Sequence, residues 1–158
     1  MPDALPVELV IDAGVPVNYA VSINPYHAQA RQFFADAARE GWQLISPSFW
    51  EAEADTAIMR MESYGALNNA AAQKLLDATP IMVVYEPSAR SVARRLAARI
   101  HQRKVYDSSY LALAQVRGCD IWTADQRLFN AAQTAGLDFV KFIGAYSSVS
   151  VGEADKST

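Results

Sequence analysis

Three glycine residues, Gly41, Gly118 and Gly136, stand where a helical pattern of apolar residues gives way to a short strand-like segment. Glycine readily adopts the left-handed conformation that ends a helix and turns the chain sharply into the next element. The repeated order of helix, glycine and strand predicts parallel strands connected by helices. We therefore expect an α/β fold with a central, mainly parallel, twisted sheet of four to five strands and helices on both of its faces.

The positions of the elements follow from apolar runs and from the residues that interrupt them. Strands are predicted for five short apolar runs: 8–11, 42–45, 81–85, 119–122 and 137–140. Helices are predicted where apolar residues recur every three or four positions: from about 25 to 40, from about 48, then 69–77, 89–100, 106–117 and 125–135. Asn24 and Ser88 are the expected N-caps of two helices, with Pro25 in the first turn of one.

Length and composition bound the type of protein. A chain of 158 residues, 51% of them hydrophobic, is long enough for one domain with a sizeable core. We expect a single domain over residues 1–143 and a flexible tail over 144–158, which is small, polar and without periodicity. No run of about 18 apolar residues occurs, so no membrane span is expected. Because the first residues do not resemble a signal peptide and Cys119 has no disulfide partner, we expect a cytoplasmic location.

Four carboxylates fall where a predicted strand ends or a predicted helix begins: Asp12, Glu53, Asp107 and Asp125. In an alternating α/β fold such positions converge on one edge of the sheet, where ligands bind. Two carboxylates about 5 Å apart repel by roughly 3 kcal/mol at an effective dielectric near 20. Several such pairs would offset much of a typical stability of about 5–15 kcal/mol. The pattern therefore indicates a site in which a cation belongs between the acids.

Each acid, taken alone, also has a structural explanation. Asp107 and Asp125 stand at helix starts, where aspartate is a good N-cap, although both also begin the apolar stripe of their helix. Asp12 ends an apolar strand and could cap the turn that follows it. Glu53 could be an exposed helix residue, although it borders the apolar stripe more closely than its acidic neighbours do. These explanations stay open for any single acid, and the combination of four favours the cation site.

The residue types indicate a hard divalent cation. Carboxylate oxygens are the ligands that Mg²⁺ and Mn²⁺ prefer. A zinc site is disfavoured, because His27, His101 and Cys119 are the only residues of the types that usually hold zinc besides the acids. We expect surface roles for the two histidines and a buried structural role for the cysteine.

Positive charge is concentrated in one segment, although the net charge of the chain is −3. A 15-residue window without any acid holds six basic residues: Arg90, Arg94, Arg95, Arg99, Arg103 and Lys104. Such a face could contact phosphate groups, although the solvated surface of a helix is the commoner explanation of such a run. The sequence leaves both interpretations open.

Over residues 8–142 the sequence resembles the PIN-domain ribonucleases, especially the VapC-like toxins of bacterial toxin–antitoxin pairs. The resemblance rests on four segments: VIDAG with Asp12, SPSFWEAEADTA with Glu53, VYDSSYLALA with Asp107 and GCDIWTADQRL with Asp125. The last two segments are the most specific, because their spacing and order match the family. The resemblance implies that the four acids hold one or two Mg²⁺ or Mn²⁺ ions in a PIN-like fold.

Of two further positions near these acids, one matches the family pattern and the other departs from it. Thr123 matches a position whose hydroxyl group often supports the site in the family. Gly14 departs from the pattern, because family members often carry a small hydroxyl or amide side chain two residues after the first aspartate. This departure removes one polar contact and leaves the acids intact.

The resemblance also implies a reaction and partners. The expected reaction is hydrolysis of an RNA phosphodiester by water that the metal activates, and Lys104, Arg103 and Arg95 are candidates for contact with the RNA backbone. A small antitoxin protein and a second copy of the chain are the expected protein partners. A non-catalytic PIN-fold module that binds metal, protein or RNA remains the alternative.

Phosphoryl-transfer proteins with acids at strand ends fit the sequence poorly. A haloacid-type phosphatase needs a second aspartate where Gly14 stands, and a receiver domain needs an aspartate at the end of its third strand, where Tyr85 and Glu86 occur. The chain contains no G-x-x-x-x-G-K-[ST] motif, which excludes a P-loop enzyme.

Overall fold

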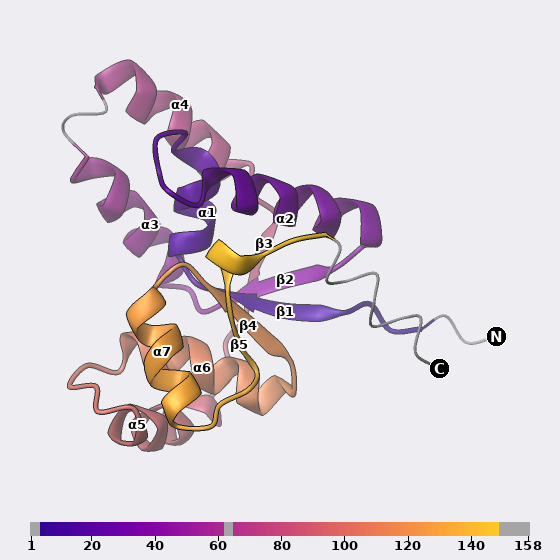
Figure 1. Ribbon diagram of the computed structural model, residues 1–158, viewed down its shortest axis with the longest axis vertical. Helices are drawn as coiled ribbons and strands as arrows, with labels where there is room; N and C mark the ends of the chain where they lie inside the picture. The colour runs from indigo at the N-terminus through magenta and orange to yellow at the C-terminus, as the bar shows by residue number, and fades with distance from the viewer. Residues whose placement is uncertain (1–3, 62–64, 149–158) are drawn as a thin grey trace.

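Five parallel strands form one sheet between two groups of helices in the computed structural model, which describes residues 4–61 and 65–148 (Figure 1). The strand order is β3-β2-β1-β4-β5, and every neighbouring pair is parallel. The strands are β1 (Glu8–Ile11), β2 (Gln43–Ser46), β3 (Ile81–Val83), β4 (Asp120–Thr123) and β5 (Val140–Phe142). The predicted α/β class with a parallel sheet is confirmed.

Helices cover both sides of the sheet. They are α1 (Gly14–Ala20), α2 (His27–Glu40), α3 (Trp50–Met59), α4 (Ala66–Asp77), α5 (Ala89–Arg99), α6 (Tyr106–Arg117) and α7 (Gln126–Thr134), followed by the short 3₁₀ helix η2 (Ile143–Ala145). In the view of Figure 1, α1 to α4 lie above the sheet and α5 to α7 lie below it. Among the described residues, no helix is both long enough and apolar enough to cross a lipid bilayer.

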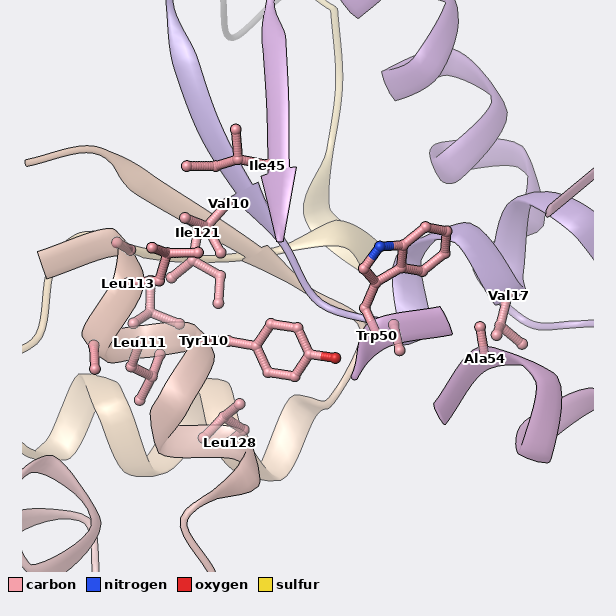
Figure 2. Packing of buried hydrophobic residues seen from close by; sticks show 14 of the residues in the cluster. Val10, Val17, Ile45, Trp50, Ala54, Tyr110, Leu111, Leu113, Ile121 and Leu128 are labelled. Carbon is pink, nitrogen blue, oxygen red and sulfur yellow. The ribbon is translucent and has the colours of Figure 1, made fainter. Parts of the chain in front are cut away.

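The alternation of side chains along β1 divides the core into two clusters. Leu9 and Ile11 belong to the cluster that contains Phe33 of α2, whereas Val10 belongs to a larger cluster with residues of α1 and of α3 to α7. Figure 2 shows the second cluster, with Val10 close to side chains of the neighbouring strands and of α6. Successive strand residues point to opposite faces, so a sheet that helices cover on both sides needs apolar residues at consecutive positions.

Residues 144–148 are bound to α2. Asp36 of α2 is only 1% exposed and accepts hydrogen bonds from the hydroxyl groups of Tyr146 at 2.7 Å and Ser148 at 2.6 Å. The ring of Tyr146 contacts the ring of Phe33 edge-on, with centroids 5.2 Å apart. The first residues of the segment that we predicted to be a flexible tail are therefore packed, and residues 149–158 of that prediction lie outside the described residues.

The three glycines have the conformation that the sequence predicts. Gly41, Gly118 and Gly136 have φ values of +69°, +66° and +73°. Gly41 and Gly118 follow the last residues of α2 and α6 directly, and each is the C-cap of its helix. These residues therefore end helices and begin the approach to the next strand, as their positive φ allows.

Several element boundaries differ from the prediction. Helix α1 was not predicted: it has only seven residues and carries Pro16, which the first turn of a helix tolerates because its N–H groups have no intrahelical partner. Helix α2 begins at His27 with Tyr26 as N-cap, so the prediction of Asn24 as N-cap was wrong. Ser88 occupies the N-cap position of α5, but its hydroxyl group bonds to Glu86 instead of the helix.

Candidate metal centre

The strand order determines where a ligand can approach the sheet. From β1 the chain continues to β2 and β3 on one side, whereas β4 and β5 lie on the other side. The carboxyl ends of β1 and β4 therefore form the switch point at which α/β sheets bind ligands. Asp12 follows β1 directly, and its backbone N–H donates to the carbonyl oxygen of Trp122 in β4 at 3.1 Å.

One cavity at this switch point is lined by all four predicted acids. Its volume is about 310 Å³, and the lining residues are Asp12, Ala13, Gly14, Asn18, Glu53, Asp107, Tyr110, Ala124 and Asp125. We call it the acid cavity. The structure thus brings together four carboxylates that span more than 110 positions of the sequence, from residue 12 to residue 125. Their roles as metal ligands or catalytic groups stay a prediction.

Asp12 is the most buried of the four acids, with 7% of its surface exposed. Burial raises the pKa of Asp12 to about 7, and the nearby charge of Asp107 contributes to this increase. Hydrogen bonding by Thr123, Ala124 and Gly14 acts in the opposite direction and lowers the pKa. The bond from the Gly14 backbone N–H to Oδ1 of Asp12 is 3.0 Å long, so Asp12 also caps the turn after β1. A carboxylate kept partly protonated near neutral pH is a group that a bound cation would ionise.

Asp107 occupies the electrostatic centre of the acid cavity. It lies in the first turn of α6, whose N-cap is Val105, so the explanation of Asp107 as an N-cap is excluded. Burial and the charge of Asp125 raise the pKa of Asp107. In turn, the charge of Asp107 raises the pKa of Asp12 and of Glu53. Each of the other three acids therefore interacts with Asp107.

Glu53 is half-buried and is held by Tyr110. The hydroxyl group of Tyr110 donates to Oε2 of Glu53 at 3.1 Å. Burial raises the pKa of Glu53, and the bond from Tyr110 opposes this effect. Figure 2 shows the ring of Tyr110 projecting from α6, with its hydroxyl group directed toward the helix that begins at Trp50. The sequence analysis placed Glu53 closer to the apolar stripe than its acidic neighbours. In agreement, Glu51 is exposed and does not line the acid cavity.

Asp125 is the N-cap of α7. Its Oδ1 accepts hydrogen bonds from the backbone N–H groups of Arg127 at 2.9 Å and Leu128 at 3.1 Å. The capping explanation is therefore correct for Asp125, and it does not remove the residue from the acid cavity. The backbone N–H of Asp125 donates to the hydroxyl oxygen of Thr123 at 3.0 Å, so the predicted supporting residue joins Asp125 to Asp12.

Sequence reasoning missed two polar residues of the acid cavity. Tyr110 was assigned only to the apolar stripe of α6, and Asn18 lies in the helix that was not predicted. The side-chain amide of Asn18 donates to the carbonyl oxygen of Gly14 at 2.8 Å, and its oxygen accepts from the backbone N–H of Tyr26 at 3.1 Å. Its role is to hold α1 and the following loop around the cavity.

Gly14 is tightly packed at the position where the family pattern leads one to expect a side chain. A Cβ atom built there would lie 3.0 Å from Cβ of Ala124 and 3.2 Å from Oδ1 of Asp12. Such contacts are tighter than most real Cβ contacts, so the neighbouring atoms would have to shift by a few tenths of an ångström. The glycine therefore allows the ends of β1 and β4 to approach each other.

The residues present fit a hard divalent cation by their chemistry. All four acids offer oxygen ligands, and three of them have a raised pKa because they are buried close to other carboxylates. Within residues 4–61 and 65–148, no three His, Cys, Asp or Glu side chains are close enough to surround one ion as they stand. Mg²⁺ usually keeps several of its waters, so a partial set of direct protein ligands is compatible with its binding.

None of the other residues considered from the sequence lines the acid cavity. Arg95, Arg103 and Lys104 are exposed and do not line the acid cavity. Nδ1 of His27 lies 2.9 Å from the carbonyl oxygen of Asn18, which is a backbone contact. Cys119 is only half-buried, and burial raises the pKa of its thiol to about 11, so the thiol form dominates at neutral pH.

Comparison with known proteins agrees with this fold and topology. The sequence model of the PIN domain family matches residues 10–142. The chain belongs to the PIN-domain family. Proteins of this family are generally nucleases. The matched segment contains all four acids and Thr123.

Solved structures show the same PIN fold. PAE2754 from Pyrobaculum aerophilum has a TM-score of 0.65 and 20% identity, over 97% of this chain and 99% of that one. VapC20 from Mycobacterium tuberculosis, a toxin that cleaves the sarcin-ricin loop, has a TM-score of 0.59 and 15% identity, over 78% of this chain and 94% of that one. A search of curated proteins finds no significant match.

Proposed function

We propose that this PIN-domain protein is a metal-dependent ribonuclease that cleaves RNA internally and acts in the cytoplasm as the toxin of a toxin–antitoxin pair. The observation that carries the proposal is the gathering of Asp12, Glu53, Asp107 and Asp125 around one cavity. Burial and repulsion raise the pKa of three of these acids. This arrangement destabilises the protein alone and becomes favourable when a dication is bound.

The proposed ligands are the four acids, with one or two Mg²⁺ or Mn²⁺ ions. Asp12 and Asp107 are the central ligands, because one is the most buried acid and the other interacts with all the rest. Glu53 and Asp125 complete the shell directly or through water. When bound, such an ion supplies Lewis-acid chemistry that activates water and offsets the charge developing on the phosphate. No histidine base is required.

The chain's own residues orient these ligands. Thr123 donates to Asp12 and thereby favours the ionised carboxylate, and Tyr110 does the same for Glu53. Asp125 uses Oδ1 as the cap of α7, which leaves Oδ2 for the acid cavity. Polar groups that fix the orientation of metal ligands typically change metal affinity by about 10–100-fold when they are removed.

RNA is the proposed substrate, and an excess of positive charge near α6 supports this choice. Arg95, Arg103 and Lys104 are exposed in the segment that precedes Asp107. In our proposal they attract the RNA backbone and compensate for the repulsion between phosphate and the acids. The attraction acts over about a Debye length, so it does not require that these residues line the cavity.

The proposed toxin role is supported by the fold shared with VapC20, which is a toxin. The protein partners in this proposal are a small antitoxin, which lays a segment into the acid cavity, and a second copy of the chain. A short reading frame directly beside the gene would support the antitoxin. Copurification of its product with the full chain is the biochemical measurement.

A non-catalytic PIN-fold binding module is the second candidate. One observation favours it: among the described residues, no three acids are close enough to surround an ion as they stand. Metal binding without any turnover of RNA would select this candidate.

The deciding experiment is cleavage of a mixed RNA pool by the full chain with Mg²⁺ or Mn²⁺, with EDTA, and by Asp107→Asn. Asp55→Asn is the matched control, because Asp55 is an exposed acid of α3 that does not line the acid cavity. We expect cleavage by the parent and by Asp55→Asn, and none with EDTA or by Asp107→Asn. Cleavage that persists in all four conditions would show that the acid cavity is not the active site.

A further inference from the structure

A second cavity, of a different chemical kind, lies at the edge of the sheet. Its volume is about 460 Å³, and its walls come from the end of β3, the loop before α3 and the first turns of α5 and α6. Its walls are mainly apolar and include Phe49, Val83, Tyr85 and Val105. We call it the β3 groove. Its size and lining are typical of sites that bind small organic groups.

The β3 groove and the acid cavity share a wall. Phe49 lines the groove and Tyr110 lines the acid cavity, and the two rings contact each other edge-on with centroids 5.1 Å apart. The first two turns of α6 contribute to both, with Asp107 in the acid cavity and Ser109 in the groove. The groove is therefore adjacent to the cavity in which we propose that RNA is cleaved.

The exposed groups around the β3 groove are aromatic and cationic. Tyr85 is 87% exposed and Tyr106 is 57% exposed, and the ring of Tyr106 lies 5.7 Å from that of Phe49. Arg90 and Arg94 line the groove and are exposed. In the part of the chain that the structure describes, neither arginine has a carboxylate oxygen within 4.0 Å.

The groove also contains one carboxylate, Glu86, and both of its oxygen atoms have partners within the chain. Its Oε1 accepts a hydrogen bond from Ser88 at 3.0 Å, and its Oε2 lies 3.9 Å from Arg117. Glu86 is therefore not paired with Arg90 or Arg94, whose positive charges are available to an external anion.

We propose that the β3 groove binds one unstacked base of a single-stranded RNA, next to the nucleotide that is cleaved in the acid cavity. The base packs against the apolar and aromatic walls, and Arg90 and Arg94 bind the adjacent phosphates. Aromatic platforms beside arginines are the usual means by which proteins hold unpaired bases. The proposal rests on the proposed ribonuclease function and adds that the substrate is unpaired at this position.

Two features favour RNA over another occupant. RNA carries a phosphate at every nucleotide, which matches arginines beside an apolar pocket. A second copy of the chain seated on the groove would have to supply carboxylates to both Arg90 and Arg94, because burying an unpaired charge is unfavourable. The shared wall also places the groove next to the site that we propose for cleavage.

The test measures RNA binding separately from cleavage. Every variant is made in full-length Asp107→Asn protein, and the fluorescence anisotropy of a labelled single-stranded RNA is compared with that of the same sequence in a duplex. Val83→Asp places a charge in the groove, and Met82→Asp is its control, because both residues are exposed on edge strand β3 and only Val83 lines the groove. Arg94→Ala is compared with Arg31→Ala, an exposed arginine of α2 outside the groove.

We expect Val83→Asp and Arg94→Ala each to weaken single-strand binding by about ten-fold, and the two controls by less than about two-fold. In the Asp107→Asn protein without these substitutions, duplex RNA should bind more weakly than single-stranded RNA. Val83→Asp should weaken duplex binding less than it weakens single-strand binding. Groove variants that bind single strands like their controls would overturn the inference. So would a dimer that dissociates on Val83→Asp, seen by light scattering, with unchanged RNA affinity of the monomer.

These outcomes are separable from failure of the ribonuclease proposal. If the parent cleaves RNA with metal while Val83→Asp and Arg94→Ala bind RNA normally, only the base-binding groove is wrong. If the groove variants lose single-strand binding while the parent cleaves no RNA under any metal condition, the groove stands and the nuclease proposal fails. A parent chain that binds no single-stranded RNA would contradict both.

Discussion

The hydroxyl group of Thr123, at the end of β4, interacts with the carboxylate of Asp12, which follows the neighbouring strand β1, and lowers its pKa. The same oxygen accepts the backbone N–H of Asp125 at 3.0 Å. Thr123 is completely buried, so this link is not exchanged for water. One side chain therefore sets the relative position of two of the four acids.

Replacing Thr123 by valine should weaken metal binding and also lower the stability of the fold. The change removes the donor to Asp12 and leaves the N–H of Asp125 without its partner, at a cost of about 1–3 kcal/mol in unfolding free energy. We expect the affinity for Mn²⁺, measured by titration calorimetry, to fall by about ten-fold or more. Thr123→Ser keeps the hydroxyl group and should bind Mn²⁺ like the parent. Equal affinities for the valine and serine variants would exclude an orienting role for the hydroxyl.

The stability of the metal-free protein should decrease as the pH rises from about 4 to about 7. Burial raises the pKa of Asp12 to about 7, so in this range the folded state binds a proton that the unfolded state has released. The shift corresponds to about 4 kcal/mol over the whole range, of which roughly 2–3 kcal/mol is lost between pH 5 and pH 8. Urea unfolding at these two pH values measures that part of the effect. Asp12→Asn should show a clearly smaller difference between the two pH values, and an unchanged difference would contradict the assignment.

Asp125 has two roles that two substitutions can separate. Asparagine caps helices about as well as aspartate, so Asp125→Asn should keep the bonds to Arg127 and Leu128 while it removes the charge that repels Asp107. We expect this variant to be at least as stable as the metal-free parent and to bind Mn²⁺ more weakly. Asp125→Ala should lose about 1 kcal/mol of unfolding free energy in addition. If the alanine variant were as stable as the asparagine variant, capping by Asp125 would be unimportant.

Tyr110→Phe should reduce metal affinity through its effect on Glu53. The ring and its packing remain, but Glu53 loses the hydrogen bond that lowers its pKa, so Mn²⁺ binding should weaken and shift to higher pH. Tyr146→Phe is the matched control, because it removes a buried hydroxyl group that bonds to Asp36, and neither residue lines the acid cavity. It should lower stability by about 1 kcal/mol and leave the affinity for Mn²⁺ unchanged. Parallel losses of affinity in both variants would indicate a general effect on folding.

The elements that sequence reasoning predicted well depend on local chemistry. Gly41 and Gly118 end helices because their positive φ is an intrinsic property of glycine, and the range 106–117 for α6 was correct at both ends. Helix α1 was missed because it is short and contains Pro16. What holds it in place is contact with other elements, including the bond between Asn18 and Tyr26, which no local pattern reveals.

The acids were recognisable in the sequence because parallel strands direct their carboxyl ends to one edge. Their surroundings were not recognisable. The bond between Tyr110 and Glu53 joins residues 57 positions apart, and an aromatic residue in an apolar stripe gives no sign of a polar partner. The β3 groove likewise combines the loop before α3 with α5 and α6, and its arginines were not distinguishable from other basic residues of the same window.

The order of apolar, glycine and acidic residues by itself determined the parallel α/β architecture. It also determined which four carboxylates meet at one edge of the sheet, because both results follow from the periodicity of helices and strands. Only the tertiary structure decided that Asp107 is the electrostatic centre, that Asp125 is also a cap and that an apolar groove adjoins the acids. Burial, charge interaction and shared cavities are properties of distances between remote residues, and these distances exist only once the chain has packed.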